Sequence, residues 1–92
     1  MEYREFDLSC KYDARANFYG KARVRVYENG DEDLISYNTV VAEKRGDEIE
    51  LKGWYSQTTG RHINEYIQQY GFNPMTKKQI ENSNKLKIPK WE

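Results

Sequence analysis

Hydrophobic and polar residues alternate along the first part of the chain. The alternation is clearest near the start, where one side of the pattern holds Phe6, Leu8, Cys10 and Tyr12. A period of two residues is typical of a strand that buries one face. We therefore predict strands over residues 5–12, 18–27, 34–43 and 48–55.

An Asn29-Gly30 pair separates the second and third predicted strands. Both residue types tolerate positive φ, so Asn-Gly between two strand patterns predicts a hairpin. A two-residue turn would place Arg23 opposite Ser36 and Val24 opposite Ile35. The acidic residues 31–33 also allow a longer loop.

The third predicted strand has the weaker alternation that is expected of a central strand. Its pattern puts alternate residues toward the core, namely Ile35, Tyr37, Thr39 and Val41. The residues expected to face outward are Ser36, Asn38 and Val40.

The hydrophobic period changes after residue 55. One apolar stripe has the i, i+3, i+4, i+7 spacing of a helix and comprises Ile63, Tyr66, Ile67 and Tyr70. Ser56, Thr58 or Thr59 can cap the start of this helix, and Gly71 can end it. A capping-box pattern from Thr76 predicts a short second helix over about 77–83.

This order of elements predicts one α+β domain across residues 1–92. Strands followed by helices favour an antiparallel sheet with helices on one face. We expect three to four strands within about 4–55 and an amphipathic helix at about 58–70 packed on one face. The basic tail, 84–92, either docks as an extra edge strand or stays loose. The sheet residues expected under the helix are Val24, Val26, Ile35, Ile49 and Leu51.

Composition narrows the class of protein. The chain has 15 basic and 15 acidic residues, so it lacks the net positive charge typical of strong non-specific nucleic-acid binding. Cys10 is the only cysteine, which rules out an intrachain disulfide. No apolar run approaches the length of a membrane span, and no signal-peptide pattern begins the sequence. We expect a cytoplasmic protein without membrane contact, either monomeric or homodimeric.

The sequence offers little for catalysis. His62 is the only histidine, and the chain has no second histidine or cysteine to build a nitrogen and sulfur metal site, so we expect no metal or cofactor. Ser56, Thr58 and Thr59 lie close to His62 in sequence, but they are also the expected helix caps. We therefore expect a non-enzymatic protein, and a catalytic role for His62 is the third hypothesis.

A basic row on the second predicted strand is a candidate nucleic-acid surface. Sheet faces that carry arginine, lysine and aromatic residues bind nucleic acids through phosphate contacts and stacking. The alternative is an ordinary solvated strand, neutralised by Glu48 and Glu50 across the sheet. The row comprises Lys21, Arg23 and Arg25, with Tyr19 and Tyr27 beside them.

Two polar stretches, 36–39 and 55–59, are dense in hydroxyl and amide groups. Such groups suit an adaptable hydrogen-bonding surface, and both stretches could meet at one end of the sheet. Strand propensity and helix capping are the simpler explanation.

Three segments give the chain a resemblance to a known set of proteins: DARANFYGKA at 13–22, SYNTVVA at 36–42 and YSQTTGRHINEY at 55–66. They resemble an uncharacterised family of small proteins encoded by phages, prophages and mobile elements of Gram-positive bacteria. Ala14 and Ala16 replace polar residues expected in that family, which puts any ligand contact of their loop in doubt.

The resemblance implies an accessory protein that acts by binding a host or phage protein, such as an inhibitor of a CRISPR or other anti-phage effector. The alternative is a small nucleic-acid-binding module. The candidate binding residues are Arg15, Tyr19, Lys21, Arg23, Arg25, Ser36, Asn38, Trp54, Ser56, Thr58, Arg61 and His62.

Overall fold

The computed structural model describes residues 2–13, 18, 20–82 and 85–88. Within them, a six-stranded sheet has the order β1-β2-β3-β4-β5-β6, and every neighbouring pair is antiparallel. The two helices are α1 (Gln57–Gln69) and α2 (Lys77–Asn82). The strands are β1 (Tyr3–Asp7), β2 (Ala22–Tyr27), β3 (Glu32–Ser36), β4 (Thr39–Arg45), β5 (Glu48–Leu51) and β6 (Lys85–Lys87).

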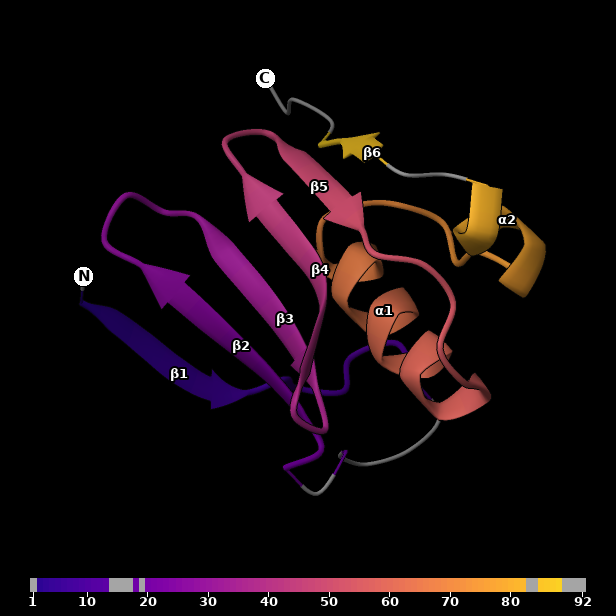
Figure 1. The fold of residues 1–92 in the computed structure, drawn as a ribbon, viewed down its shortest axis with the longest axis horizontal. Coiled ribbons are helices and arrows are strands. Elements are labelled where there is room, and N and C mark those ends of the chain that lie inside the picture. Colours follow the sequence, from indigo (N-terminus) through magenta and orange to yellow (C-terminus); the bar gives the residue numbers. More distant parts are fainter. Residues whose placement is uncertain (1, 14–17, 19, 83–84, 89–92) are drawn as a thin grey trace.

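Helix α1 lies against one face of the sheet, and the two edges of the sheet are β1 and β6 (Figure 1). The core lies between α1 and the sheet. It is formed by buried residues from Leu8, after β1, to Ile80 in α2, including Val24, Leu34, Ala42, Ile49, Ile63 and Ile67. The α+β class and the single antiparallel sheet are confirmed, with more strands than the three to four expected.

The local signals at the helix ends are also confirmed. The Ser56 side chain accepts a hydrogen bond from the backbone N–H of Thr59. Gly71 follows the C-cap residue Tyr70, has a φ of 96° and donates its N–H to the Gln68 carbonyl. In the capping box, the Gln79 side chain accepts from the Thr76 N–H at 2.8 Å. The described part of the tail forms the edge strand β6.

The predicted third strand is wrong, because residues 34–43 are divided between β3 and β4. A two-residue turn separates these strands, and its first residue, Tyr37, has a φ of 60°. The first turn carried a glycine signal, but this one has none. Tyr37 is therefore exposed rather than directed to the core.

At the first hairpin the two-residue turn is wrong by one residue, and the longer loop that the sequence also allowed is present. Tyr27 donates to the Asp31 carbonyl, so the loop has three residues and ends at Gly30 with a φ of 90°. A one-residue slip moves every side chain of a strand to the opposite face. As a result Ser36 points toward α1, whereas Ile35 pairs with Arg23 on the other face.

Candidate binding surface

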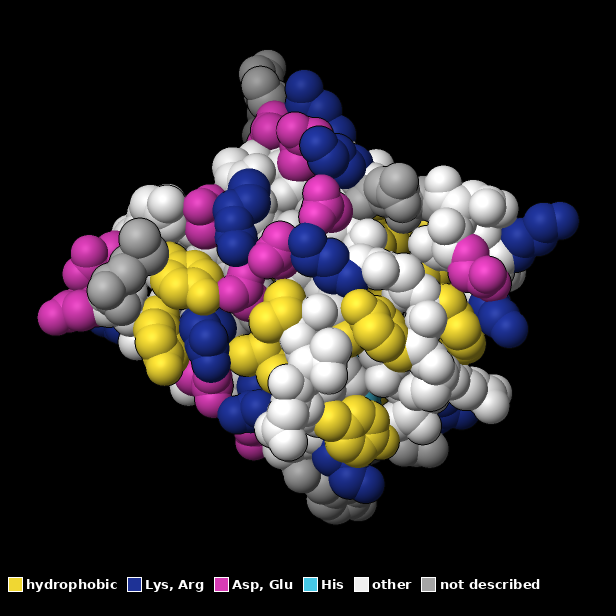
Figure 2. Space-filling model, in the orientation of Figure 1, with side chains coloured by type: hydrophobic (Ala, Val, Ile, Leu, Met, Phe, Trp, Pro, Cys, Tyr) yellow, Lys and Arg dark blue, Asp and Glu magenta, His cyan; other side chains and the backbone are white. Residues whose placement is uncertain are grey.

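The sheet face opposite α1 is a network of paired charges. Figure 2 shows acidic and basic side chains interleaved over the molecule. On β2, the Arg23 and Arg25 guanidiniums both bind the carboxylate of Glu5, at 2.8 and 3.1 Å. The predicted basic row is therefore neutralised from β1, not from the Glu48 and Glu50 side of the sheet.

The centre of this face is less exposed. Asp33 is buried and accepts hydrogen bonds from the Tyr27 hydroxyl at 2.6 Å and the Arg45 guanidinium at 3.0 Å. The hydrogen bond to Asp33 is the main cause of a raised pKa for Tyr27. Lys52 joins Glu43 and Glu50 in the same network, at 2.8 and 2.6 Å.

A second cluster lies between the end of β3 and the start of α1. The Ser36 hydroxyl is 2.8 Å from His62 Nδ1 and 2.9 Å from the Thr59 hydroxyl. The Phe18 ring packs edge-on against His62, with a centroid separation of 4.5 Å. Ser36 and His62 are only 2% and 1% exposed. Because a nucleophile must be accessible to its substrate, this burial supports a structural role for the pair.

Above this cluster, the β3–β4 turn presents an aromatic ring to solvent. Tyr37 is 47% exposed, and its ring centroid lies 6.0 Å from that of His62. The backbone of the turn is fixed on both sides: the Tyr37 N–H donates to the Lys21 carbonyl at 2.7 Å, and Arg23 donates to the Tyr37 carbonyl at 3.0 Å. Arg23 also reaches the Asn38 side chain at 3.5 Å. We call Arg23, Tyr37 and Asn38 the Tyr37 surface.

Helix α1 also fixes the loop that follows β1. One carboxylate oxygen of Glu65 accepts the backbone N–H groups of Lys11, Tyr12 and Asp13 at 3.0, 2.8 and 2.8 Å, and the other accepts from Gln69. Burial acts to raise the pKa of Glu65, but these hydrogen bonds outweigh it and lower the pKa.

The polar stretches meet at one end of the sheet, as expected, through Ser36, Thr59 and His62. Thr59, not Thr58, makes the contact, and Ser56 serves as the helix cap. Two predicted residues, Arg15 and Tyr19, lie outside the described residues.

The remaining predicted residues are spread over the surface. Lys21 and Arg61 are exposed, and Arg61 lies 3.9 Å from Asp13. Trp54 packs over Gly60 so closely that a Cβ on that glycine would lie 2.5 Å from the indole ring. Sequence reasoning did not identify Glu5, because the pairing of β1 with β2 is long-range.

The family comparison matches most of the fold. A model described as a family of unknown function, DUF8033, matches residues 6–82. The chain belongs to DUF8033. The DUF8033 match extends from within β1 through α2, and so includes the Tyr37 surface and Glu65. No curated protein and no solved structure matches the chain.

The described residues contain no group of three or more His, Cys, Asp or Glu side chains placed to hold a metal ion. Neither α1 nor α2 is both long and apolar enough to cross a bilayer.

Proposed function

We propose that this chain acts by binding another protein through the Tyr37 surface, without catalysis. Its resemblance to small phage-type proteins favours an accessory factor, with a host defence protein as the target class. The observation that carries the proposal is the conformation of Tyr37. A non-glycine residue at positive φ costs about 1 kcal/mol or more, and persists where the surrounding structure imposes it.

The surroundings of Tyr37 support this interpretation. Two hydrogen bonds to the Tyr37 backbone hold the turn, one with the Lys21 carbonyl and one from the Arg23 side chain, yet the Tyr37 ring is half exposed. Asn and Gly adopt positive φ at lower cost than an aromatic residue. Tyrosine is enriched among the residues that dominate protein interfaces. A rigid, exposed tyrosine beside an arginine is therefore better explained by contact with a partner than by folding.

One substitution tests the role of the Tyr37 ring in binding without destabilising the fold. Tyr37→Gly removes the ring and relieves the backbone, so its thermal stability should equal or exceed that of the parent chain. Proteins captured from a Gram-positive host lysate by the parent chain should be lost with Tyr37→Gly. They should be kept with Tyr12→Ala, a matched change at another exposed tyrosine. Identical capture by all three chains would refute the proposal.

The nucleic-acid alternative rests on the basic row of β2. The pairing of Arg23 and Arg25 with Glu5 leaves these side chains less available for phosphates. If the alternative holds, the chain should shift the mobility of DNA or RNA at low salt, and replacing both arginines with alanine should abolish the shift. Unchanged mobility at low salt would eliminate it.

A further inference from the structure

We propose that the β1 edge of the sheet pairs with β1 of a second copy of this chain, in an antiparallel register centred on Glu5. The two edges of the sheet differ in how well they are protected. β6 has only three residues, two of them lysines, which is a common way to block an edge. β1 has five residues, all of them exposed, and no described strand lies beyond it (Figure 1).

The hydrogen-bond pattern shows which backbone groups of β1 are free to pair. The Leu8 N–H donates to the Ala22 carbonyl at 2.9 Å, in the same register that pairs β1 with β2. Backbone groups alternate in direction along a strand, so Arg4 and Phe6 also bond toward β2. The N–H and carbonyl groups of Tyr3, Glu5 and Asp7 therefore point away from the sheet.

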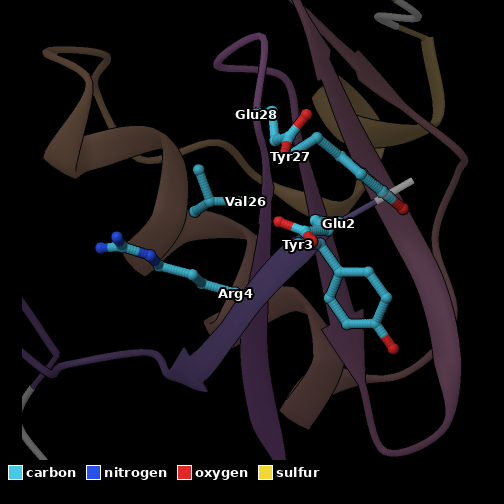
Figure 3. Close-up of a pocket in the computed structure, with 6 residues that line it drawn as sticks. All are labelled: Glu2, Tyr3, Arg4, Val26, Tyr27 and Glu28. Carbon is cyan, nitrogen blue, oxygen red and sulfur yellow. The ribbon is translucent and has the colours of Figure 1, made fainter.

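The side chains of β1 alternate between the two faces. Figure 3 shows Tyr3 and Arg4 leaving β1 on opposite sides, next to an open pocket. The Tyr3 ring is held by the Arg25 guanidinium 4.4 Å from its centroid. Phe6 is 52% exposed on the α1 side of the strand. The pocket is lined by Glu2, Tyr3, Arg4, Val26, Tyr27 and Glu28.

The sequence of β1 is complementary to itself in one register. Pairing centred on Glu5 uses all five residues and places Arg4 opposite Phe6 of the second copy, where the guanidinium can lie over the ring. A register centred on Arg4 would oppose two arginines and use fewer residues. We therefore favour the Glu5 register.

Like charges directly opposite each other normally destabilise a strand pair. In this register the two Glu5 carboxylates meet, but each is already bound by the Arg23 and Arg25 guanidiniums of its own chain. On the face that carries Glu5, Arg23 and Arg25 balance Glu5 and Asp7, so this face of each half of the contact is neutral. An edge of five residues buries little surface, and we expect a weak dimer that forms with rising concentration.

Disulfide trapping tests the register directly. In a Cys10→Ser background, Glu5→Cys places two sulfurs at the dimer axis, with Cα atoms about 5.5 Å apart, which is within disulfide range. Asp7→Cys is the matched control, because its two copies would be about 14 Å apart along the strand. Under mild oxidation, Glu5→Cys should form covalent dimer at least tenfold faster than Asp7→Cys. Equal rates, or a faster Asp7→Cys reaction, would overturn the register.

A second measurement of dimer formation does not depend on cysteine oxidation. The average mass of the full chain in analytical ultracentrifugation should rise with concentration, and Glu5→Pro should abolish the rise. Proline removes an outward N–H and leaves the bonds to β2 in place, and circular dichroism verifies the fold. Glu5→Val keeps the N–H and should keep the dimer. A parent chain that stays monomeric at every concentration, or a Glu5→Pro chain that still dimerises, would refute the proposal.

Discussion

Replacing Glu65 with glutamine should lower the free energy of unfolding by about 2 kcal/mol at neutral pH. Hydrogen bonds to a charged group contribute about 1.5–3 kcal/mol each, against about 0.5–1.5 for neutral ones. Three backbone N–H groups share one Glu65 oxygen, so their losses do not add in full. Glutamine would also bring its amide NH₂ against the NH₂ of Gln69, which now donates to Glu65.

The loss of unfolding free energy caused by Glu65→Gln should depend on pH in a defined direction. The folded-state pKa of Glu65 lies below the ordinary value of 4.5. Its carboxylate therefore stabilises the fold fully above that ordinary value, and the stabilisation is lost as pH falls through the folded-state pKa. The stability difference between the parent chain and Glu65→Gln should narrow over the same range, because the protonated acid resembles the amide.

Urea unfolding of both chains, from neutral pH down to about pH 3, measures this difference. Glu81→Gln is the matched control, since Glu81 is exposed on α2 and its replacement should change stability by less than about 0.5 kcal/mol. If the cost of Glu65→Gln stays constant with pH, the carboxylate charge is not what holds the loop, and the reasoning is wrong.

Two glycines give further tests. Gly60→Ala should lower the free energy of unfolding by about 1–3 kcal/mol, although alanine favours helices, because its methyl group would lie 2.5 Å from the Trp54 ring. Trp54 fluorescence in a Trp91→Phe background should change, and Trp54→Leu should recover part of the loss. Gly30→Ala should lower the free energy of unfolding, measured in urea, by about 1–2 kcal/mol. No neighbouring atom obstructs a Cβ at this position, so the loss would come from the φ of 90°, which is strained for alanine.

Local signals predicted the helices well. The stripe from Ile63 to Tyr70, the Ser56 cap and Gly71 all act within a few residues of each other, so the sequence contains the whole interaction. The Thr76 capping box is similar, and the structure confirms it at 2.8 Å. The two helices can therefore be predicted without knowledge of distant contacts.

The sheet was harder to predict because its register depends on two turns. Asn29-Gly30 correctly indicated a hairpin, but one extra loop residue reversed the faces of Ser36 and Ile35. The second turn begins at Tyr37, a residue type that rarely takes positive φ, and nothing in the local pattern indicated it. The sequence pattern therefore predicts that Ser36 faces outward, although the structure buries it against His62.

Arg23 connects the two proposed surfaces. One nitrogen of its guanidinium binds Glu5 on the β1 edge at 2.8 Å, and the other donates to the Tyr37 carbonyl at 3.0 Å. A planar guanidinium can hold two acceptors in fixed directions, whereas a lysine ammonium presents a point charge on a flexible stem. Because Arg23 is partly exposed, its contribution to folding stability should be small, below about 1 kcal/mol.

Arg23→Lys should therefore weaken both partner binding and self-association while leaving the fold intact. The two sites are otherwise separate: Tyr37→Gly should remove only partner capture, and Glu5→Pro should remove only self-association. In Arg23→Lys, Glu5 loses one of its two guanidinium partners, so the repulsion across the dimer axis increases, and the Tyr37 carbonyl loses its donor. Partner capture and sedimentation of the same preparation measure both effects. If Arg23→Lys changes only one of them, the two surfaces do not share this residue and the link between them fails.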